Sequence, residues 1–571
     1  MSLSPVSSYE LLPAAVGGVD GSPGTWRVKL RDGTEFLWAG FQTGPATLSQ
    51  EDLQRISREL LGLDLDDVPR AAERELRPYV SNGTPVRSVI LHTATPVANH
   101  LQADMAYAVT RQHSDDLAAY METRAVVLAQ KGDLVVGRTS AWRAAARLAG
   151  VEGVEVPGIE YYYLTHAILR LAADQGPGAP PLRRLIEELR ARPATVIRLY
   201  LLDRETQLVL LYLKRMAGIE VLYNDASSPE VAEYWKTKAP LHPSAEEAAG
   251  LMAGAGSPDA TLAAESALSP LRRRLNVTCA VVPGYTVDGR GGARAGVAAS
   301  LALAARLLRE RYGISRGCLK PSAGTSGAGI TPGIDLSDTA RLGELAGRVC
   351  AAREEFVLEA HVTYLTRQVG GQQLMLSPSV HIRHGHPAPG MMLQITKGTH
   401  CQGNVYIDEA ACRSAGVSPG QYRAVRSGLE ALRRGFCQAR LSVATAGFDF
   451  AVGRVGGSFG DQVLVALQDP NLSSNGAEYL RLFLDDVGAR GGPAYGATKM
   501  IIPVASLAEL TMSAERSAPG DWARVMSAVP GRWGMLACAA DSPAAAVELI
   551  TKWEQEWTGN GLILPMTARC E

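Results

Sequence analysis

The chain has 571 residues, more than a single hydrophobic core usually organises, so two to four domains are expected. Apolar residues make up 46% of it and charged residues 20%, which is the balance of a folded, soluble protein. The formal net charge of −1 argues against broad electrostatic binding to nucleic acid or to an anionic membrane. The expected partner is therefore a small molecule or another protein.

From the N-terminus, the first predicted elements are a hairpin over 25–40, with an Asp-Gly pair at its turn, and a polar helix over 49–62. From residue 86 onward, short apolar strands alternate with helices, a pattern that predicts an open α/β domain. The elements expected there are strands at 87–95, 125–130, 194–202 and 219–224, with a helix at 208–218.

Glycine, proline and alanine become frequent at 239–262, which predicts a linker or mobile surface segment. Strand and helix patterns resume at 276–287, and the apolar run at 295–308 predicts a buried or half-buried helix because it is too short to span a bilayer. Near the C-terminus, 535–557 predicts a strand followed by a helix.

Cysteine spacing and the N-terminal composition predict the compartment. The eight cysteines are scattered, form no C-x-x-C pair and lack zinc-finger spacing, so free thiols in a reducing cytoplasm are expected. The N-terminal residues show no basic region followed by an apolar core, and no secretory signal is expected.

A glycine-rich stretch, CLKPSAGTSGAGI at 318–330, is a candidate phosphate-binding loop. Its lysine precedes the glycines, which excludes a Walker loop, and its glycine spacing does not match a Rossmann loop. Strand-like residues at 314–320 precede it; a helix at 336–352 and a strand at 354–362 follow. Backbone N–H groups with one ammonium would make a nucleotide phosphate clamp. An ordinary glycine-rich hairpin is the alternative.

Two acidic strands further along are a candidate metal site. Strands are expected around 446–455 and 462–469, joined by a Gly/Ser turn. If that turn is centred near Ser458, Asp449 lies across from Gln468, which brings Asp449 and Asp469 together, with Asn471 on the same side as Asp469. Two carboxylates and an amide oxygen suit Mg²⁺. A surface hairpin with Asx-type turns is the alternative.

Taken in order, several segments resemble the ATP-grasp superfamily. They are NDASSPE, VVPG, LKPSAGTSGAGI, FVLEAHV, GFDF and DPN, spread over about 220–490. More narrowly, LSPSVHIR at 376–383 resembles a strand of the pheganomycin-type peptide ligases, which carry an α/β pre-ATP-grasp domain in front. The resemblance implies an α/β and α+β multidomain fold, with an ATP-grasp fold preceded by an open α/β domain.

The resemblance also implies an activity and a division of the chain. ATP and Mg²⁺, or Mn²⁺ in its place, would activate a substrate carboxylate as an acyl phosphate for attack by an amine, in a cytoplasmic ligase of natural-product peptide assembly that acts on an amino acid or peptide. A homodimer is one expected assembly. The expected units are an N-terminal β-rich region, the α/β domain, the two ATP-grasp lobes and a C-terminal α/β unit, at 1–85, 86–265, 266–500 and 501–571.

Residue roles follow from matching the motifs. Lys320 would contact ATP phosphate or adenine. The remaining nucleotide contacts would be the loop residues Gly324, Ser326 and Gly327 and the hinge residues Glu359 and Val362, and the metal ligands would be Asp449, Asp469 and Asn471. The chain departs from the family in having an aspartate at 469, Ser473 in place of an arginine, and only Arg272–Arg274 where an earlier ATP lysine is expected.

Two further residues are candidates for catalysis. Arg383 would stabilise the transferred phosphoryl group, because Ser379, His381 and Arg383 share one face of a predicted strand; a surface-strand arginine is the alternative. Lys397 lies in 395–406, which would close over the acyl phosphate and exclude water, or be a plain exposed loop. Two other functions stay open: a phosphotransferase on the same fold, and a non-catalytic nucleotide-binding module with a decayed site.

Overall fold

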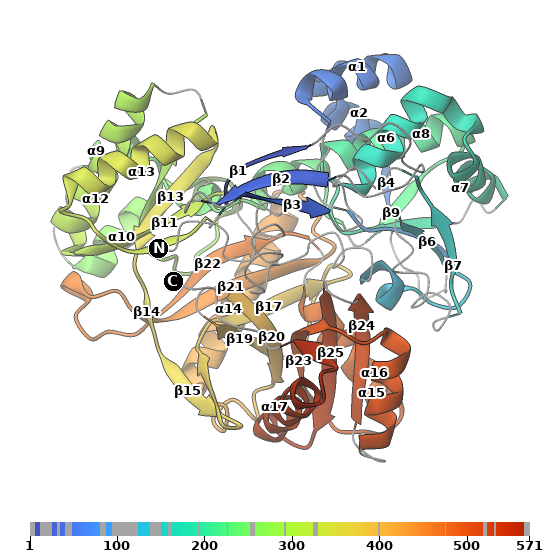
Figure 1. The fold of residues 1–571 in the computed structure, drawn as a ribbon. Coiled ribbons are helices and arrows are strands. Elements are labelled where there is room, and N and C mark those ends of the chain that lie inside the picture. Colours follow the sequence, from blue (N-terminus) through green and yellow to red (C-terminus); the bar gives the residue numbers. More distant parts are fainter. Residues whose placement is uncertain are drawn as a thin grey trace.

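The described residues form three large units (Figure 1). They are an open α/β domain, a small α+β lobe and a large α+β lobe, coloured from blue to teal, from green to yellow, and from yellow to red. The computed structural model describes residues 6–11, 25–30, 35–39, 48–79, 87–93, 124–137, 150–157, 163–191, 195–224, 226–251, 257–290, 293–323, 329–397, 400–473, 476–517, 522–529 and 533–564.

A three-stranded antiparallel sheet lies at the N-terminus: β1 (Val6–Leu11), β2 (Thr25–Leu30) and β3 (Glu35–Ala39). The hairpin predicted over 25–40 is therefore confirmed, and its Asp-Gly turn lies outside the described residues.

The α/β domain is built on a six-stranded sheet in the order β4-β9-β8-β5-β6-β7, and all its neighbouring strands are parallel. Its strands are β4 (Arg77–Pro78), β5 (Ser88–Leu91), β6 (Leu134–Gly137), β7 (Glu152–Glu155), β8 (Val196–Leu199) and β9 (Leu222–Asn224). Its helices are α1 (Gln50–Leu61), α2 (Val68–Glu75), α6 (Leu164–Gln175), α7 (Pro180–Ala191) and α8 (Arg204–Ala217). The alternation of strands and helices in the sequence predicted this architecture.

Two predictions for this domain are wrong. Residues 124–128 are helical, not a strand, because a short apolar run does not distinguish the two. The boundary at 85 does not separate a unit either: α1 and α2 pack into the same core as the parallel sheet, through residues such as Ile56, and β4 pairs with β9.

The segment 239–262 was expected to be a linker or mobile surface segment, but its described residues, 239–251 and 257–262, form packed structure instead. It contains the helix α9 (Ala245–Ala249) and the start of α10 (Pro258–Ser266), and it packs against the small lobe through fully buried Ala245 and Ala248. Alanine serves here as a small buried residue in a helix, and composition alone did not reveal that.

The small lobe carries a four-stranded antiparallel sheet in the order β10-β13-β11-β12, with α12 and α13 packed in the same core. Its elements are β10 (Gly284–Asp288), α12 (Arg294–Tyr312), β11 (Arg316–Pro321), β12 (Thr331–Asp335), α13 (Thr339–Ala352) and β13 (Glu355–Ala360). The strands and helices predicted on both sides of the glycine-rich stretch are confirmed, and Asp338 caps α13. That stretch joins two antiparallel strands, β11 and β12, as predicted.

The large lobe is built on an eleven-stranded sheet. Its strands are β14 (Thr363–Tyr364), β17 (Pro378–Arg383), β18 (His386–Pro387), β19 (Met391–Lys397), β20 (His400–Ile407), β21 (Ala446–Arg454), β22 (Leu464–Asn471), β23 (Tyr495–Pro503), β24 (Trp522–Val529), β25 (Trp533–Ala540) and β26 (Ile563–Leu564). A separate hairpin comprises β15 (Thr366–Val369) and β16 (Gln372–Met375), and the helices are α14 (Pro419–Gln438), α15 (Ala477–Ala489), α16 (Leu507–Ser517) and α17 (Pro543–Gly559).

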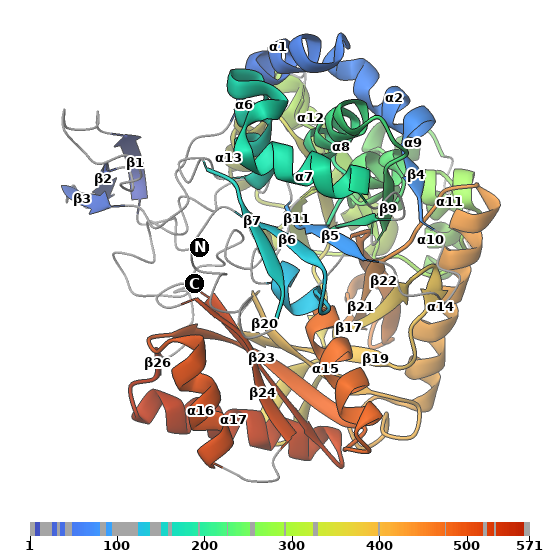
Figure 2. The same ribbon diagram turned by 90° about the vertical axis from the view of Figure 1, so that its right-hand side faces the viewer.

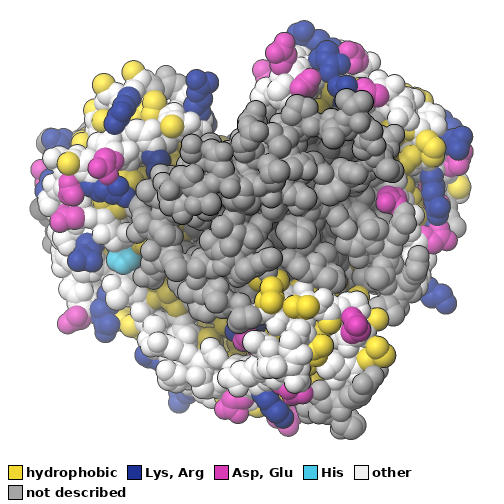
Figure 3. Space-filling model, viewed as in Figure 1, with side chains coloured by type: hydrophobic (Ala, Val, Ile, Leu, Met, Phe, Trp, Pro, Cys, Tyr) yellow, Lys and Arg dark blue, Asp and Glu magenta, His cyan; other side chains and the backbone are white. Residues whose placement is uncertain are grey.

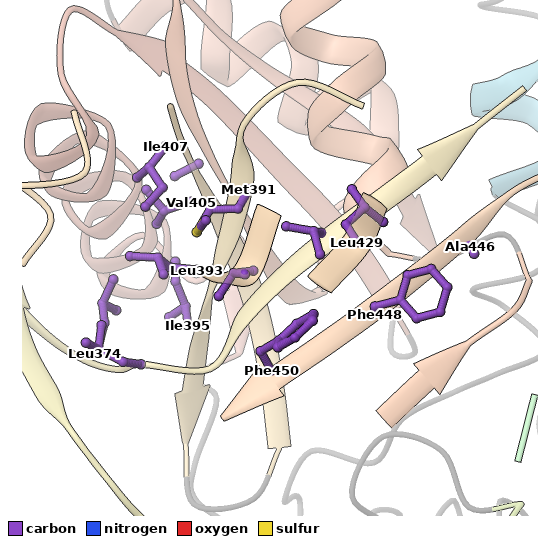
Figure 4. Packing of buried hydrophobic residues seen from close by; sticks show 14 of the residues in the cluster. Leu374, Met391, Leu393, Ile395, Val405, Ile407, Leu429, Ala446, Phe448 and Phe450 are labelled. Atoms are coloured by element: carbon purple, nitrogen blue, oxygen red, sulfur yellow. The ribbon is translucent and has the colours of Figure 1, made fainter. Parts of the chain in front are cut away.

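The main core cluster of this lobe contains Leu393, Leu429 and Phe450 (Figure 4). A separate cluster that includes Leu480 of α15 also packs in this lobe. The predicted boundary at 500 is wrong, because β23 crosses it and pairs with β20 on one side and β25 on the other. The strand and helix predicted at 535–557 are confirmed as β25 and α17, which belong to the large lobe.

The surface carries charges of both signs. On the face seen in Figure 3, basic and acidic side chains are interspersed over the described parts of the chain. No helix among the described residues combines the length and apolar character that crossing a bilayer requires. The predicted class, an α/β and α+β multidomain protein with an open α/β domain ahead of two α+β lobes, is confirmed.

Candidate functional site

Lys320 and Glu359 form a buried ion pair on the small-lobe sheet. They lie on the adjacent strands β11 and β13, where Cys318 is paired with Glu359 and Lys320 with Val357. Both side chains are almost fully buried, and the Lys320 ammonium contacts the Glu359 carboxylate directly. Burial alone would raise the pKa of Glu359, but the charges of Lys320 and His242 outweigh it and lower this pKa to about 2. The pair is therefore fully ionised at neutral pH.

Three other elements complete the surroundings of Glu359. His242 lies 3.6 Å from its carboxylate. The Gln468 amide of β22 donates to it over 3.3 Å, and the Tyr364 hydroxyl donates in turn to the Gln468 carbonyl oxygen. Gly284 on β10 faces Glu359 so closely that an added Cβ would lie 2.8 Å from the Glu359 Cβ. The two lobes thus meet at a buried, hydrogen-bonded carboxylate.

The glycine-rich stretch begins beside this pair. Gly324, Ser326 and Gly327 lie outside the described residues, and their predicted role remains a prediction. Before them, the Ser322 carbonyl and hydroxyl oxygens accept hydrogen bonds from the N–H groups of Lys238 and Ala239. Val362, expected in the hinge, is buried just after β13.

Asp449 and Asp469 lie directly opposite each other on β21 and β22. The predicted pairing of Asp449 with Gln468 is wrong by one residue, because the register shifts after Asp449 and the next pair is Phe450 with Leu467. This leaves Gln468 as the extra residue of a bulge. The bulge turns Gln468 toward Glu359 and puts both aspartates on one face, where directly opposed side chains are neighbours.

Asn471 joins the two aspartates as predicted. Its amide nitrogen donates to the Asp449 carboxylate over 3.0 Å, so its amide oxygen is the atom that would bind a metal ion. Ser379 on β17 is paired with Asp449 from the other side and hydrogen-bonds to it. Burial and the charge of Asp469 raise the pKa of Asp449 to about 6, so the pair carries more negative charge than its surroundings compensate.

These residues fit a hard divalent cation. Two carboxylates and an amide oxygen would hold Mg²⁺, which usually completes its shell with water and phosphate oxygens. Among the residues that the structure describes, no group of three or more His, Cys, Asp or Glu side chains is placed to hold a metal ion. A metal at this position would therefore depend on ligands from water or substrate.

Lys238 is the functional candidate that the sequence did not reveal. Its side chain is nearly buried, and its ammonium lies 3.1 Å from the Asp469 carboxylate. The arginines considered for an early ATP contact point elsewhere: Arg273 pairs with Glu247, and Arg274 pairs with Glu230. The signal was present in EYWKTKAP at 233–240, a lysine-containing segment between the α/β domain and the small lobe, but no periodicity marked it.

Arg383 is not brought into this cluster, and the role expected of Lys397 remains a prediction. Arg383 pairs with Asp485 of α15 over 3.2 Å. It lies four residues beyond Ser379 on β17, which separates the two residues by about 13 Å along the strand. Ser379 and His381 do share a face, since the Ser379 hydroxyl lies 3.1 Å from a His381 ring nitrogen. The closing loop expected at 395–406 is instead the β19–β20 hairpin, in which the backbones of Lys397 and His400 pair, and the Lys397 side chain is outside the described part.

No family model matches the sequence, and no curated protein matches it. Among solved structures, the chain is similar to the N5-carboxyaminoimidazole synthetase of Staphylococcus aureus complexed with ADP, at 9% identity and a TM-score of 0.43 over 84% of this chain and 98% of that one. It is also similar to the biotin carboxylase domain of the Hydrogenobacter thermophilus 2-oxoglutarate carboxylase with MgADP, at 12% identity and a TM-score of 0.45 over 83% and 90%. The chain is also similar to D-cycloserine synthetase, at 12% identity and a TM-score of 0.30 over 50% of this chain and 78% of that one. These TM-scores are too low to carry an argument.

Proposed function

We propose that the protein is an ATP-grasp ligase that uses ATP and Mg²⁺ to join a carboxylate to an amine, with release of ADP and phosphate. The observation that carries the proposal is the meeting of two charged groups across the two lobes. Lys320 and Glu359 lie on the small lobe, and Asp469 of the large lobe pairs with Lys238. Gln468, next to Asp469, donates to Glu359 and links the two groups.

The proposed reaction has two steps. A carboxylate oxygen attacks the γ-phosphorus of ATP, the bond to the β–γ bridging oxygen breaks, and ADP leaves with the electron pair. The amine nitrogen then attacks the acyl carbon, a C–N bond forms, and the C–O bond to phosphate breaks. Phosphate leaves with that electron pair, and the nitrogen loses a proton to solvent. Phosphorylation is needed because a free carboxylate is a poor acyl donor.

Each charged group of the candidate site would have a role in this reaction. Bound at Asp449, Asp469 and Asn471, Mg²⁺ would supply charge neutralisation to the phosphate oxygens. Lys238, at the same edge, would add one ammonium to the developing charge on the transferred group. Lys320, held in place by Glu359, would contact the remaining phosphates or adenine from the small lobe.

The proposed substrates are an amino acid or short peptide as the carboxylate and a second small molecule as the amine. The support is the resemblance of 376–383 to the pheganomycin-type peptide ligases, which favours peptide assembly in natural-product biosynthesis. A cytoplasmic location and a homodimer remain parts of the same proposal.

The test is ADP release across a panel of amino acids and short peptides, supplied singly and in pairs with MgATP. A ligase releases ADP and phosphate only when both an acid and an amine are present. The D469N variant should lose turnover, while D461N, an exposed aspartate in the turn between the same strands, should keep it. Phosphate retained on the product would indicate a phosphotransferase, and no thermal shift with MgATP would indicate a decayed binding module.

A further inference from the structure

Polar side chains follow two neighbouring strands at the carboxyl edge of the parallel sheet. His92 comes directly after β5, and Tyr200 comes directly after β8. These strands pair with each other, so both residues lie at the same edge, and their ring centroids are 6.1 Å apart in an edge-on arrangement. Carboxyl edges of open α/β sheets are where such domains bind ligands.

This edge meets the chain segment that follows the candidate metal ligands. Tyr200 is hydrogen-bonded to Ser473, two residues beyond Asn471. Arg124 pairs with Glu478 in the first turn of α15, and its guanidinium lies 5.8 Å from the ring centroid of Tyr200. Figures 1 and 2 show the α/β domain on one side of this junction and α15 on the other. The carboxyl edge is therefore next to the proposed reaction centre.

His92 has unused hydrogen-bonding capacity at this junction. Its side chain is 1% exposed, yet within the described part of the chain neither ring nitrogen has a hydrogen-bond partner. Leaving a buried polar group unpaired is unfavourable, so such a group points to a partner that the described residues do not supply. Burial, and then the charges of Arg124 and Arg198, lower the pKa of His92 well below its ordinary value. The ring is thus neutral, with one nitrogen able to accept.

We propose that this edge binds the amine substrate of the ligase, with a ring nitrogen of His92 accepting a hydrogen bond from the amine. The inference rests on the proposed function and names which part of the molecule holds the second substrate. Burial disfavours a positive charge at this edge, and Arg198 and Arg124, the latter partly offset by Glu478, add to this effect, so the site favours the unprotonated amine over the ammonium ion. The unprotonated form is the one that attacks an acyl phosphate.

The test compares H92L with H166L, using the acid and amine found active in the panel and hydroxylamine as a small substitute nucleophile. His166 is a matched buried histidine of the same domain, but its ring accepts a hydrogen bond from the Leu48 N–H over 2.9 Å. We expect H92L to raise KM for the amine about five- to tenfold, which corresponds to the loss of one hydrogen bond. The rate of ATP-dependent hydroxamate formation and KM for ATP should both stay within about twofold of the wild-type values. H166L should lower Tm and leave KM for the amine unchanged.

A second variant distinguishes loss of the hydrogen bond from a general loss of folding. H92Q keeps an acceptor in place of the ring nitrogen and should restore much of the affinity for the amine. An unchanged KM for the amine in H92L, a failure of H92Q to restore it, or a change in KM for the carboxylate instead, would overturn the proposal. Absence of hydroxamate with the wild-type protein would refute the proposed function itself, so the two failures are distinguishable.

Discussion

The carboxylate pair gives the sharpest prediction about stability and metal binding. The pKa of Asp449 is raised from 3.8 to about 6 by burial and by Asp469. At a pH above both values the group is ionised in the folded and unfolded states, and the folded state carries the full penalty. At 1.36 kcal/mol per pH unit, this penalty is at most roughly 3 kcal/mol. It disappears as the pH falls through about 6 toward 4.

The D449N variant removes the charge without changing the shape. Without Mg²⁺, we expect D449N to have a higher Tm than the wild type at about pH 8 and nearly the same Tm at about pH 4. D461N, in the exposed turn between the same strands, should change neither value. Thermal unfolding followed by circular dichroism in metal-free buffers measures both.

Metal binding should reverse the difference in Tm between D449N and the wild type, because Mg²⁺ would neutralise the charge of Asp449. Because Asp449 is about half protonated near pH 6, binding of Mg²⁺ with ADP should release about half a proton more from the wild type than from D449N there, and about equal amounts from the two near pH 8. Titration calorimetry in buffers of different ionisation enthalpy measures this difference, because the protons released by ADP itself are common to both proteins. A lower Tm for D449N at about pH 8 without Mg²⁺, or equal proton release by both proteins near pH 6, would refute the reasoning.

Three further predictions concern the lysines and the contact between strands. K320M should destabilise the small lobe by about 3–5 kcal/mol, since Glu359 is left buried and uncompensated, whereas K320M/E359Q should regain most of the Tm and still not bind ATP in calorimetry. K238A should lower kcat about a hundredfold and should also lower Tm, because Asp469 loses its nearly buried partner, whereas K214A, which removes an ion pair on the far side of the α/β domain, should leave kcat unchanged. G284A should lower Tm, because the added Cβ would approach the Glu359 Cβ to 2.8 Å; an unchanged Tm would contradict this close contact.

Much of the fold could be predicted because its signals are local. Alternating strands and helices predicted the parallel sheet, and the residues around the glycine-rich stretch predicted the hairpin of β11 and β12. The proximity of Asp449 and Asp469 was predicted from a turn between two strands, but the bulge at Gln468 was not, since a one-residue shift leaves no mark in the hydrophobic pattern.

Contacts between distant segments could not be predicted. Lys238 reaches Asp469 across more than two hundred residues, through tertiary packing of a segment with no periodicity. Arg383 was expected near the phosphate on strand alternation alone, and alternation does not say how far along the strand a group lies from the site. The C-terminal strands continue the large-lobe sheet because β23 has partners on both sides, a fact that only the assembled sheet contains.

The central claim is that a substrate carboxylate is activated as an acyl phosphate, and isotope transfer tests it most directly. The active acid from the panel would be labelled with ¹⁸O in its carboxylate and incubated with MgATP and the amine. One labelled oxygen should appear in the released phosphate, because the C–O bond to phosphate breaks when the amine attacks. Phosphate free of ¹⁸O, released alongside ADP and amide, would contradict the account.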